Sequence, residues 1–209
     1  MVVSVNRAYS VVTSLEALWL ATITFICICA AMTLWTPDRY TQAWNFAADA
    51  HRGQRVPGTE RPYINHLGNV AMEVMRAIAV TPTVQRPDLA VQCALLHDTI
   101  EDTAVTYEMV VAEFGPEVAA GVLALSKDLA LPKAEQMADS LQRIRQQSGE
   151  VWMVKLADRI SNLQPPPRHW NQEKIQRYKA EAEMILEALG EANDWLAGRL
   201  AKKIVTYVV

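Results

Sequence analysis

One segment near the middle of the chain constrains the fold more than any other, because an apolar stretch runs directly into a cluster of ionisable side chains. Residues 90–96 are apolar at every position except Gln92. A helix that is apolar on nearly every side belongs at the centre of a protein, packed by other helices. The ionisable residues that follow are His97, Asp98, Glu101 and Asp102. Removing such groups from water costs free energy unless a partner neutralises them.

A single continuous helix over residues 88–102 is the simplest prediction for this segment. Helical geometry then places His97 beside Glu101 and Asp98 beside Asp102, each pair one turn apart. A divalent cation would neutralise the carboxylates and would bind the neutral imidazole. The segment therefore predicts a metal site at the end of a buried helix.

Two other parts of the chain supply further candidate ligands. Asp158 lies in a second strongly apolar segment, residues 151–163, and Asn162 follows one turn later on the same face. His66 stands at the start of a third apolar helix. Together with the His97-Asp98 pair, these residues offer two nitrogens and two oxygens, a mixed set that suits Mn, Fe or Zn.

Apolar positions recur at helical spacing from residue 36 onward, and no run indicates a strand. Thr36, Pro37 and Asp38 form a helix-opening signal in which the Thr36 hydroxyl caps the first turn. Helices are expected over residues 37–51, 67–78 and 88–102, up to Gly115, from Pro116, up to Gly149, over 151–163, and over 171–206 with a break at Gly190. The sequence predicts an all-α fold, a compact helical bundle.

Composition narrows the function. The formal net charge is −3 and the pI is about 5.8, whereas a duplex-binding domain usually carries a basic excess. No nucleic-acid partner is therefore expected. The three cysteines (Cys27, Cys29 and Cys93) cannot form a disulfide framework, which favours a reducing compartment and a cytoplasmic location. The sequence does not predict an oligomeric state.

The first 35 residues form a separate apolar segment. Residues 17–35 contain no charged side chain, and only Thr22, Thr24 and Thr33 among them are polar. Such a run is long enough to cross a hydrocarbon core of about 30 Å. Three interpretations stay open: an inner-membrane anchor, a signal peptide, and translated upstream sequence before a true start at Met32. The expected organisation is an apolar segment, residues 1–35, followed by one domain, residues 36–209.

The order of the candidate ligands resembles a known family. His66, then His97-Asp98, then Asp158 is similar to the HD superfamily of metal-dependent phosphohydrolases. Residues 36–206 resemble in more detail the hydrolase domain of the RelA/SpoT family, and its small stand-alone members above all. The motifs that carry this resemblance are Tyr63-Ile64-Asn65-His66, Ala94-Leu95-Leu96-His97-Asp98-Thr99-Ile100-Glu101-Asp102-Thr103, Phe114-Gly115, Val154-Lys155-Leu156-Ala157-Asp158-Arg159 and Asn162-Leu163.

The resemblance implies a hydrolase with one divalent metal ion, expected to be Mn²⁺, that removes the 3′-pyrophosphate from guanosine tetra- or pentaphosphate. The implied metal ligands are His66, His97, Asp98 and Asp158. Glu101 and Asp102 are implied to orient and deprotonate the attacking water. Arg55 and Asn162 are implied to hold the nucleotide. Lys155 is expected to offset the charge of the substrate, unless it extends along the buried helix to reach solvent.

Two positions depart from the family pattern. Val56 stands where a second basic residue usually follows Arg55, and Gln164 stands where an arginine usually follows Leu163. Both positions fall near the expected nucleotide. Two alternatives therefore stay open: an HD phosphohydrolase that acts on another nucleotide or phosphate ester, and a catalytically silent HD module that senses a nucleotide. The intact Glu101-Asp102 pair favours an enzyme over the silent module.

Overall fold

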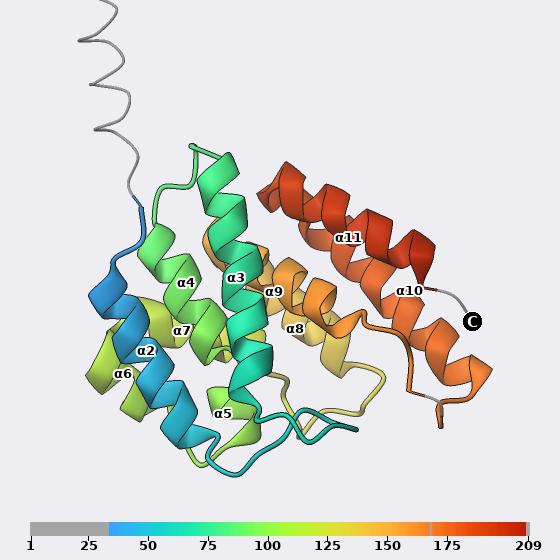
Figure 1. Ribbon diagram of the computed structural model, residues 1–209, viewed down its shortest axis with the longest axis horizontal. Helices are drawn as coiled ribbons and strands as arrows, with labels where there is room; N and C mark the ends of the chain where they lie inside the picture. The colour runs from blue at the N-terminus through green and yellow to red at the C-terminus, as the bar shows by residue number, and fades with distance from the viewer. Residues whose placement is uncertain (1–33, 168, 208–209) are drawn as a thin grey trace, which may run out of the picture. The chain divides into compact units, whose positions relative to one another are not determined.

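The computed structural model describes residues 34–167 and 169–207, most of which are helical (Figure 1). The elements are α2 (Pro37–Ala50), α3 (Ile64–Val80), α4 (Pro87–Leu96), α5 (Thr99–Asp102), α6 (Tyr107–Phe114), α7 (Pro116–Leu125), α8 (Gln136–Arg145), α9 (Gly149–Asn162), α10 (Gln172–Leu189), the 3₁₀ turn η1 (Gly190–Ala192) and α11 (Asp194–Thr206). The described residues contain no β-strand, only an isolated bridge between Arg55 and Pro62. The predicted all-α fold is confirmed.

Nearly all of the apolar segment 1–35 lies outside the described residues. Its interpretation as an anchor, a signal peptide or upstream sequence stays a prediction, and so does the domain boundary at residue 36. Trp35, which is described, packs on Tyr40 with a ring-centroid distance of 5.6 Å. Among the residues that the structure describes, no helix is long and apolar enough to cross a membrane.

Helix α4 lies at the centre of the bundle, as its apolar composition predicts. It packs against α2, α3, α7 and α9 (Figure 1), and every residue from Leu89 to Leu96 is buried. Helix α9 is the second buried helix and also contacts α3, α10 and α11. Burial of apolar surface, worth about 25 cal/mol per Å², fixes both helices in place. His97, just after α4, and Asp158, on α9, are therefore held inside the protein.

Proline and glycine set several helix boundaries where the sequence predicts them. Pro37, Pro87 and Pro116 occupy the first turns of α2, α4 and α7, where a missing amide hydrogen costs nothing. Gly115 separates α6 from α7 with a φ of 85°, a conformation that favours glycine. The predicted cap by Thr36 is wrong: its hydroxyl donates to Asp88 Oδ2 at 2.8 Å, because the first turn of α4 lies beside it.

The predicted continuous helix over residues 88–102 is also wrong. Helix α4 ends at Leu96, α5 begins at Thr99, and His97 and Asp98 form the turn between them. The Thr99 hydroxyl donates to the Leu96 carbonyl at 2.6 Å, and a side-chain donor of this kind competes with the backbone ladder of a helix. The amide of Asp102 still donates to the Asp98 carbonyl at 2.9 Å. The break therefore places His97 and Asp98 in a turn and leaves Glu101 and Asp102 on the short helix α5.

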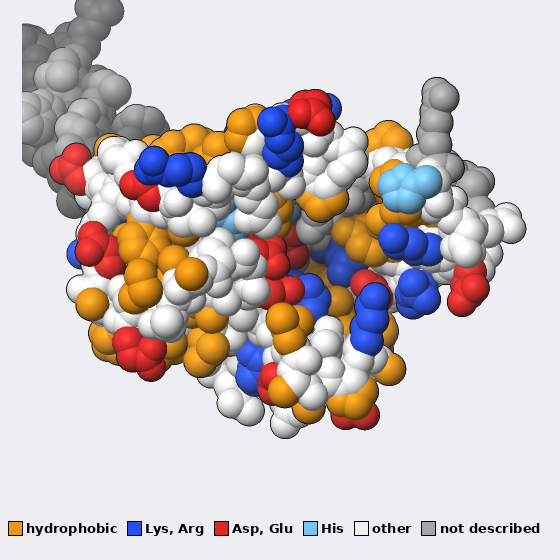
Figure 2. Space-filling model, turned by 90° about the horizontal axis from the view of Figure 1, so that it is seen from below, with side chains coloured by type: hydrophobic (Ala, Val, Ile, Leu, Met, Phe, Trp, Pro, Cys, Tyr) orange, Lys and Arg blue, Asp and Glu red, His pale blue; other side chains and the backbone are white. Residues whose placement is uncertain are grey.

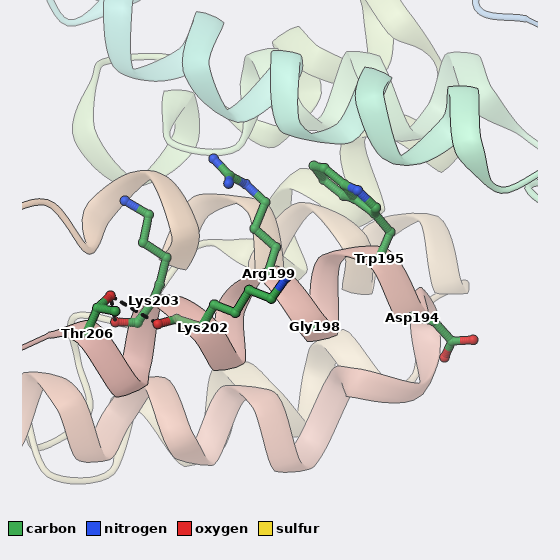
Figure 3. Close-up of a pocket in the computed structure, with 7 residues that line it drawn as sticks. All are labelled: Asp194, Trp195, Gly198, Arg199, Lys202, Lys203 and Thr206. Carbon is green, nitrogen blue, oxygen red and sulfur yellow. Dashed lines mark hydrogen bonds between the residues drawn. The ribbon is translucent and has the colours of Figure 1, made fainter.

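Helix α11 ties together the two helices that carry distant candidate ligands. Arg199 donates to the Glu73 carboxylate of α3 at 2.5 and 2.6 Å. Lys203 Nζ donates to the Leu163 carbonyl, at the end of α9, at 3.3 Å. Figure 3 shows both side chains leaving the same side of α11. The last described helix therefore fixes α3 relative to α9.

Candidate metal centre

Three segments far apart in the sequence bring ionisable side chains together at the end of α4. His66 lies in the first turn of α3, His97 and Asp98 form the turn before α5, and Asp158 lies in α9. His66 Nε2 is 3.4 Å from Asp158 Oδ1 and 3.5 Å from Asp98 Oδ2. His97 Nε2 is 3.0 Å from Asp98 Oδ2 and 3.7 Å from Asp158 Oδ1. The four predicted ligands therefore face one small volume.

Both imidazoles turn Nε2 toward this volume, because Nδ1 has another partner. His97 Nδ1 lies 2.9 Å from the Ala94 carbonyl oxygen, which can only accept, so Nδ1 carries the hydrogen. His66 Nδ1 lies 3.4 Å from Ser161 Oγ. His97 Nε2 is buried and makes no hydrogen bond with any described residue. A metal-binding histidine usually makes a hydrogen bond with one ring nitrogen, here Nδ1, and binds the metal with the other, here Nε2.

The donor set fits a divalent cation. His66, His97 and Asp158 form a buried group whose ligand atoms all lie within 4.8 Å of one another. Two ligand atoms that share one ion at about 2.1 Å lie about 3 to 4 Å apart. The four distances between imidazole and carboxylate atoms fall in that range. Imidazole with carboxylate is a donor combination that several divalent transition metals accept, so the cluster suits a divalent metal ion.

The charges in the cluster point to the same conclusion. Burial disfavours a charged His97, but the carboxylates of Asp98 and Asp158 outweigh burial and raise its pKa to about 10. Burial likewise opposes the ionisation of Asp158, but Lys155 and the two histidines hold the pKa of this carboxyl well below its usual range. The centre therefore attracts positive charge, which is either a proton on imidazole or a metal ion that replaces it.

Tyr63 joins the two acidic parts of the site. Its side chain is buried, and its hydroxyl donates to Asp98 Oδ2 at 2.6 Å and lies 3.4 Å from Asp102 Oδ2. Burial and the charges of these carboxylates raise the pKa of Tyr63, so its hydroxyl keeps its proton and remains a donor. The sequence places Tyr63 in a family motif but predicts no role for it.

The two predicted catalytic carboxylates have different surroundings. Both oxygens of Glu101 accept hydrogen bonds from Lys127, one from the backbone amide at 2.7 Å and one from Nζ at 2.8 Å. Asp102 has no such cation against it; burial and the charges of Asp98 and Glu101 raise its pKa. A raised pKa makes Asp102 a better proton acceptor than an ordinary aspartate. Lys127 follows α7, far from Glu101 in the sequence, and was not expected to contact it.

The three predicted substrate-binding residues lie in different positions. Lys155 is buried and its Nζ lies 3.4 Å from Asp158 Oδ2, so it does not extend to solvent. Asn162 donates to Asp158 Oδ1. Arg55 is exposed and donates to the carboxylate and the carbonyl of Glu60. Arg55 also lines a pocket of about 300 Å³ whose wall includes His51 and Tyr63.

Charged side chains of both signs gather on one face of the molecule. Figure 2 shows Asp and Glu side chains near the middle of this face, beside Lys and Arg side chains. Helix α5, which carries Glu101 and Asp102, lies toward this face in Figure 1. A binding face with both carboxylates and cations suits a substrate that needs a metal ion and also carries several negative charges.

Comparisons with known proteins place these features in a family. Residues 43–194 match the HD domain family. Two relatives are guanosine-3′,5′-bis(diphosphate) 3′-pyrophosphohydrolases named MESH1. The Xenopus tropicalis protein is 35% identical over 164 residues, covering 76% of this chain and 89% of its own. The human protein is 34% identical over 157 residues, covering 73% and 85%.

A solved structure gives the same result in three dimensions. It is a metazoan orthologue of SpoT that hydrolyses ppGpp, with a TM-score of 0.72 and 28% sequence identity to this chain. The alignment covers 83% of this chain and 97% of that one. The HD family match over residues 43–194 contains all four predicted metal ligands.

Proposed function

This chain belongs to the HD domain family, and from that premise we propose that it removes the 3′-pyrophosphate from guanosine tetra- or pentaphosphate. Relatives whose names state this reaction match most of the chain. The observation that carries the proposal is the buried cluster of His66, His97 and Asp158, in which both Nε2 atoms face carboxylate oxygens. Asp98 completes the set of four ligands, and Mn²⁺ is the ion that we expect there.

The reaction divides between the cation and the side chains around it. A divalent cation held by His66, His97, Asp98 and Asp158 would polarise a phosphoryl oxygen and would lower the pKa of a water toward about 7. The water oxygen forms a bond to the phosphorus attached to the 3′ oxygen. The bond from that phosphorus to the 3′ oxygen breaks, pyrophosphate carries the new oxygen away, and the 3′ oxygen takes a proton.

Asp102 is the proposed proton acceptor for the water. Its surroundings raise its pKa, and general bases work best when their pKa lies closer to the working pH. Glu101 cannot turn freely, because Lys127 holds both of its oxygens. We assign Glu101 to orienting the water and Asp102 to removing its proton.

Two lysines face the centre and offset the charge of a polyanionic substrate. Lys155 lies against Asp158, and Lys127 lies against Glu101. Burial disfavours the charge of Lys127, but Glu101, Asp158 and Asp98 outweigh it and raise its pKa. Lys127 therefore remains cationic at neutral pH. Arg55 and Asn162 are proposed to contact the nucleotide, Arg55 after releasing Glu60.

The experiment uses the full chain, stripped of metal and reloaded with Mn²⁺. We expect pyrophosphate release from guanosine tetraphosphate, with little release from GTP, GDP or ATP. In water enriched in ¹⁸O, the label enters pyrophosphate and not the nucleotide, because the bond to the 3′ oxygen breaks. The cytoplasmic location stays a prediction and is not tested by this assay.

The outcomes separate the alternatives that the sequence leaves open. Release of phosphate or pyrophosphate from a different phosphate ester would support the metal centre but contradict the proposed substrate. Val56 and Gln164, which depart from the family pattern, are consistent with such an outcome. Absence of turnover in protein that binds Mn²⁺ would favour the silent, nucleotide-sensing module. Absence of both turnover and metal binding would contradict the proposal entirely.

A further inference from the structure

Tyr63 stands at the junction of the elements that build the metal centre. It is the residue just before α3, and its carbonyl accepts the amide of His66 at 2.8 Å. Its side chain crosses to the turn between α4 and α5, where the hydroxyl donates to Asp98 Oδ2 at 2.6 Å. One residue therefore links the backbone that positions one ligand with the side chain of another.

The oxygen that Tyr63 contacts is the one that faces the centre. Asp98 Oδ2 also lies 3.0 Å from His97 Nε2 and 3.5 Å from His66 Nε2. A hydroxyl bonded to a carboxylate at this distance makes a strong, charge-assisted hydrogen bond. Without it, the Asp98 side chain would be free to rotate about its terminal torsion. The hydroxyl thus fixes which oxygen of Asp98 is presented to a metal ion.

Packing against His51 and hydrogen bonds of the preceding loop hold the ring of Tyr63 in place. His51 stacks on it with ring centroids 4.8 Å apart and an angle of 22° between the planes. His51 is buried and its Nδ1 lies 2.6 Å from Gln54 Oε1. The Gln54 carbonyl in turn accepts the amide of Tyr63 at 3.0 Å. The end of α2 and the loop after it therefore hold the ring in one position.

We propose that Tyr63 is a positioning residue that holds Asp98 in its metal-binding orientation, with His51 as the support of its ring. The hydroxyl also lies 3.4 Å from Asp102 Oδ2, so it sits between a proposed metal ligand and the proposed proton acceptor. This inference rests on the metal centre of the proposed function. It does not depend on which phosphate ester is the substrate.

The test is Tyr63→Phe, with Tyr40→Phe as its matched control. Tyr40 is a half-buried tyrosine of α2 that stacks on Trp44. Tyr40→Phe therefore removes a hydroxyl that lies away from the metal centre. We expect Mn²⁺ affinity, measured by chelator competition, to fall about 10- to 100-fold in Tyr63→Phe, as for other groups that orient metal ligands. Wild-type affinity is expected in Tyr40→Phe.

Two further readouts separate positioning from general damage. The visible spectrum of the Co²⁺-loaded protein should change in Tyr63→Phe and stay unchanged in Tyr40→Phe, because it reports the arrangement of the ligands. Activity at limiting Mn²⁺ should fall, with part of it recovered at high Mn²⁺. Unchanged Mn²⁺ affinity together with an unchanged Co²⁺ spectrum would overturn the proposal.

A second variant covers the case in which Tyr63→Phe does not fold. His51→Ala removes the ring behind Tyr63 and leaves the hydroxyl in place, and we expect it also to weaken Mn²⁺ binding. Wild-type Mn²⁺ affinity in folded His51→Ala would contradict the supporting role. Weakened binding in the variants, with no pyrophosphate release by wild type, would support the positioning role while rejecting the proposed substrate.

Discussion

The metal centre and the groove along α11 both gather charged side chains, but they treat charge in opposite ways. The groove is hollow, about 450 Å³, and is lined by Asp194, Trp195, Gly198, Arg199, Lys202, Lys203 and Thr206 (Figure 3). Arg199 is bonded to Glu73, and Lys203 is bonded to a backbone carbonyl. At the metal centre, by contrast, His97 Nε2 is buried between two carboxylates, 3.0 Å from Asp98 Oδ2 and 3.7 Å from Asp158 Oδ1.

This difference separates structural charge from functional charge. In the groove, each of these two cations has a partner, and the pairs hold helices together. At the metal centre, carboxylates and imidazoles are crowded together inside the protein, where burial is costly unless something compensates it. The volume of a pocket is therefore a poorer guide to function here than the clustering of ionisable side chains inside the protein. Variants at the two regions should behave accordingly.

Asp158→Asn should have the largest effect. The change removes a charge that faces both histidines, so we expect Mn²⁺ affinity and activity each to fall by more than about 100-fold, because groups outside the ligand set are already worth about 10- to 100-fold. Metal content by elemental analysis and pyrophosphate release check this. Retention of both in a folded variant would remove Asp158 from the centre.

Asp102→Asn should separate chemistry from metal binding. Loss of the proton acceptor should lower kcat by about 10²- to 10⁴-fold, while the bound metal remains. Stopped-time assays at saturating substrate, run beside metal analysis, measure the two quantities. A variant that loses metal and activity together would place Asp102 among the ligands instead.

Lys127→Met should have a smaller effect than either carboxylate change. It removes Nζ from one oxygen of Glu101, but the backbone amide of residue 127 still holds the other oxygen. We expect kcat to fall roughly tenfold, equivalent to about 1.4 kcal/mol, with Mn²⁺ affinity nearly unchanged. Activity equal to wild type would show that the amide alone orients Glu101.

Arg199→Gln should have the smallest effect on turnover and should act on stability instead. Glu73 is buried, with an exposed fraction of 4%, and its loss of a partner should cost about 1 to 3 kcal/mol of unfolding free energy. Urea unfolding measures this cost. Mn²⁺ affinity measured at low temperature should match wild type. A large loss of metal binding there would show that the α11 contacts shape the centre directly.

The sequence predicts the centre well where the information is local. The apolar residues before His97 predict a buried helix because burial follows from composition, and α4 confirms it. The prediction that His66, Asp98 and Asp158 form one site comes from the resemblance to a family, which rests on the order and spacing of the motifs. Helical periodicity alone does not predict that three segments far apart in the sequence contact one another.

The parts that the sequence does not predict depend on tertiary contacts. Threonine occurs in helices and at their ends, so the sequence does not predict the turn at residues 97–98, where the Thr99 hydroxyl donates to the Leu96 carbonyl. Lys127 reaches Glu101 because α5 packs on α7, and no local pattern encodes that meeting. The role of Tyr63 depends on the same kind of contact, since its partner lies 35 positions away.

The distance along the chain between ligands has a consequence for how such proteins diversify. His97 and Asp158 lie 3.7 Å apart between Nε2 and Oδ1, although a long stretch of chain that includes the connection at 126–135 separates them in sequence. The entropy of closing a loop grows only with the logarithm of its length, so doubling this stretch would cost about 0.6 kcal/mol. Insertions in this connection should therefore cost little stability at the ligands. Such a surface connection can lengthen and vary while the inherited metal centre stays intact.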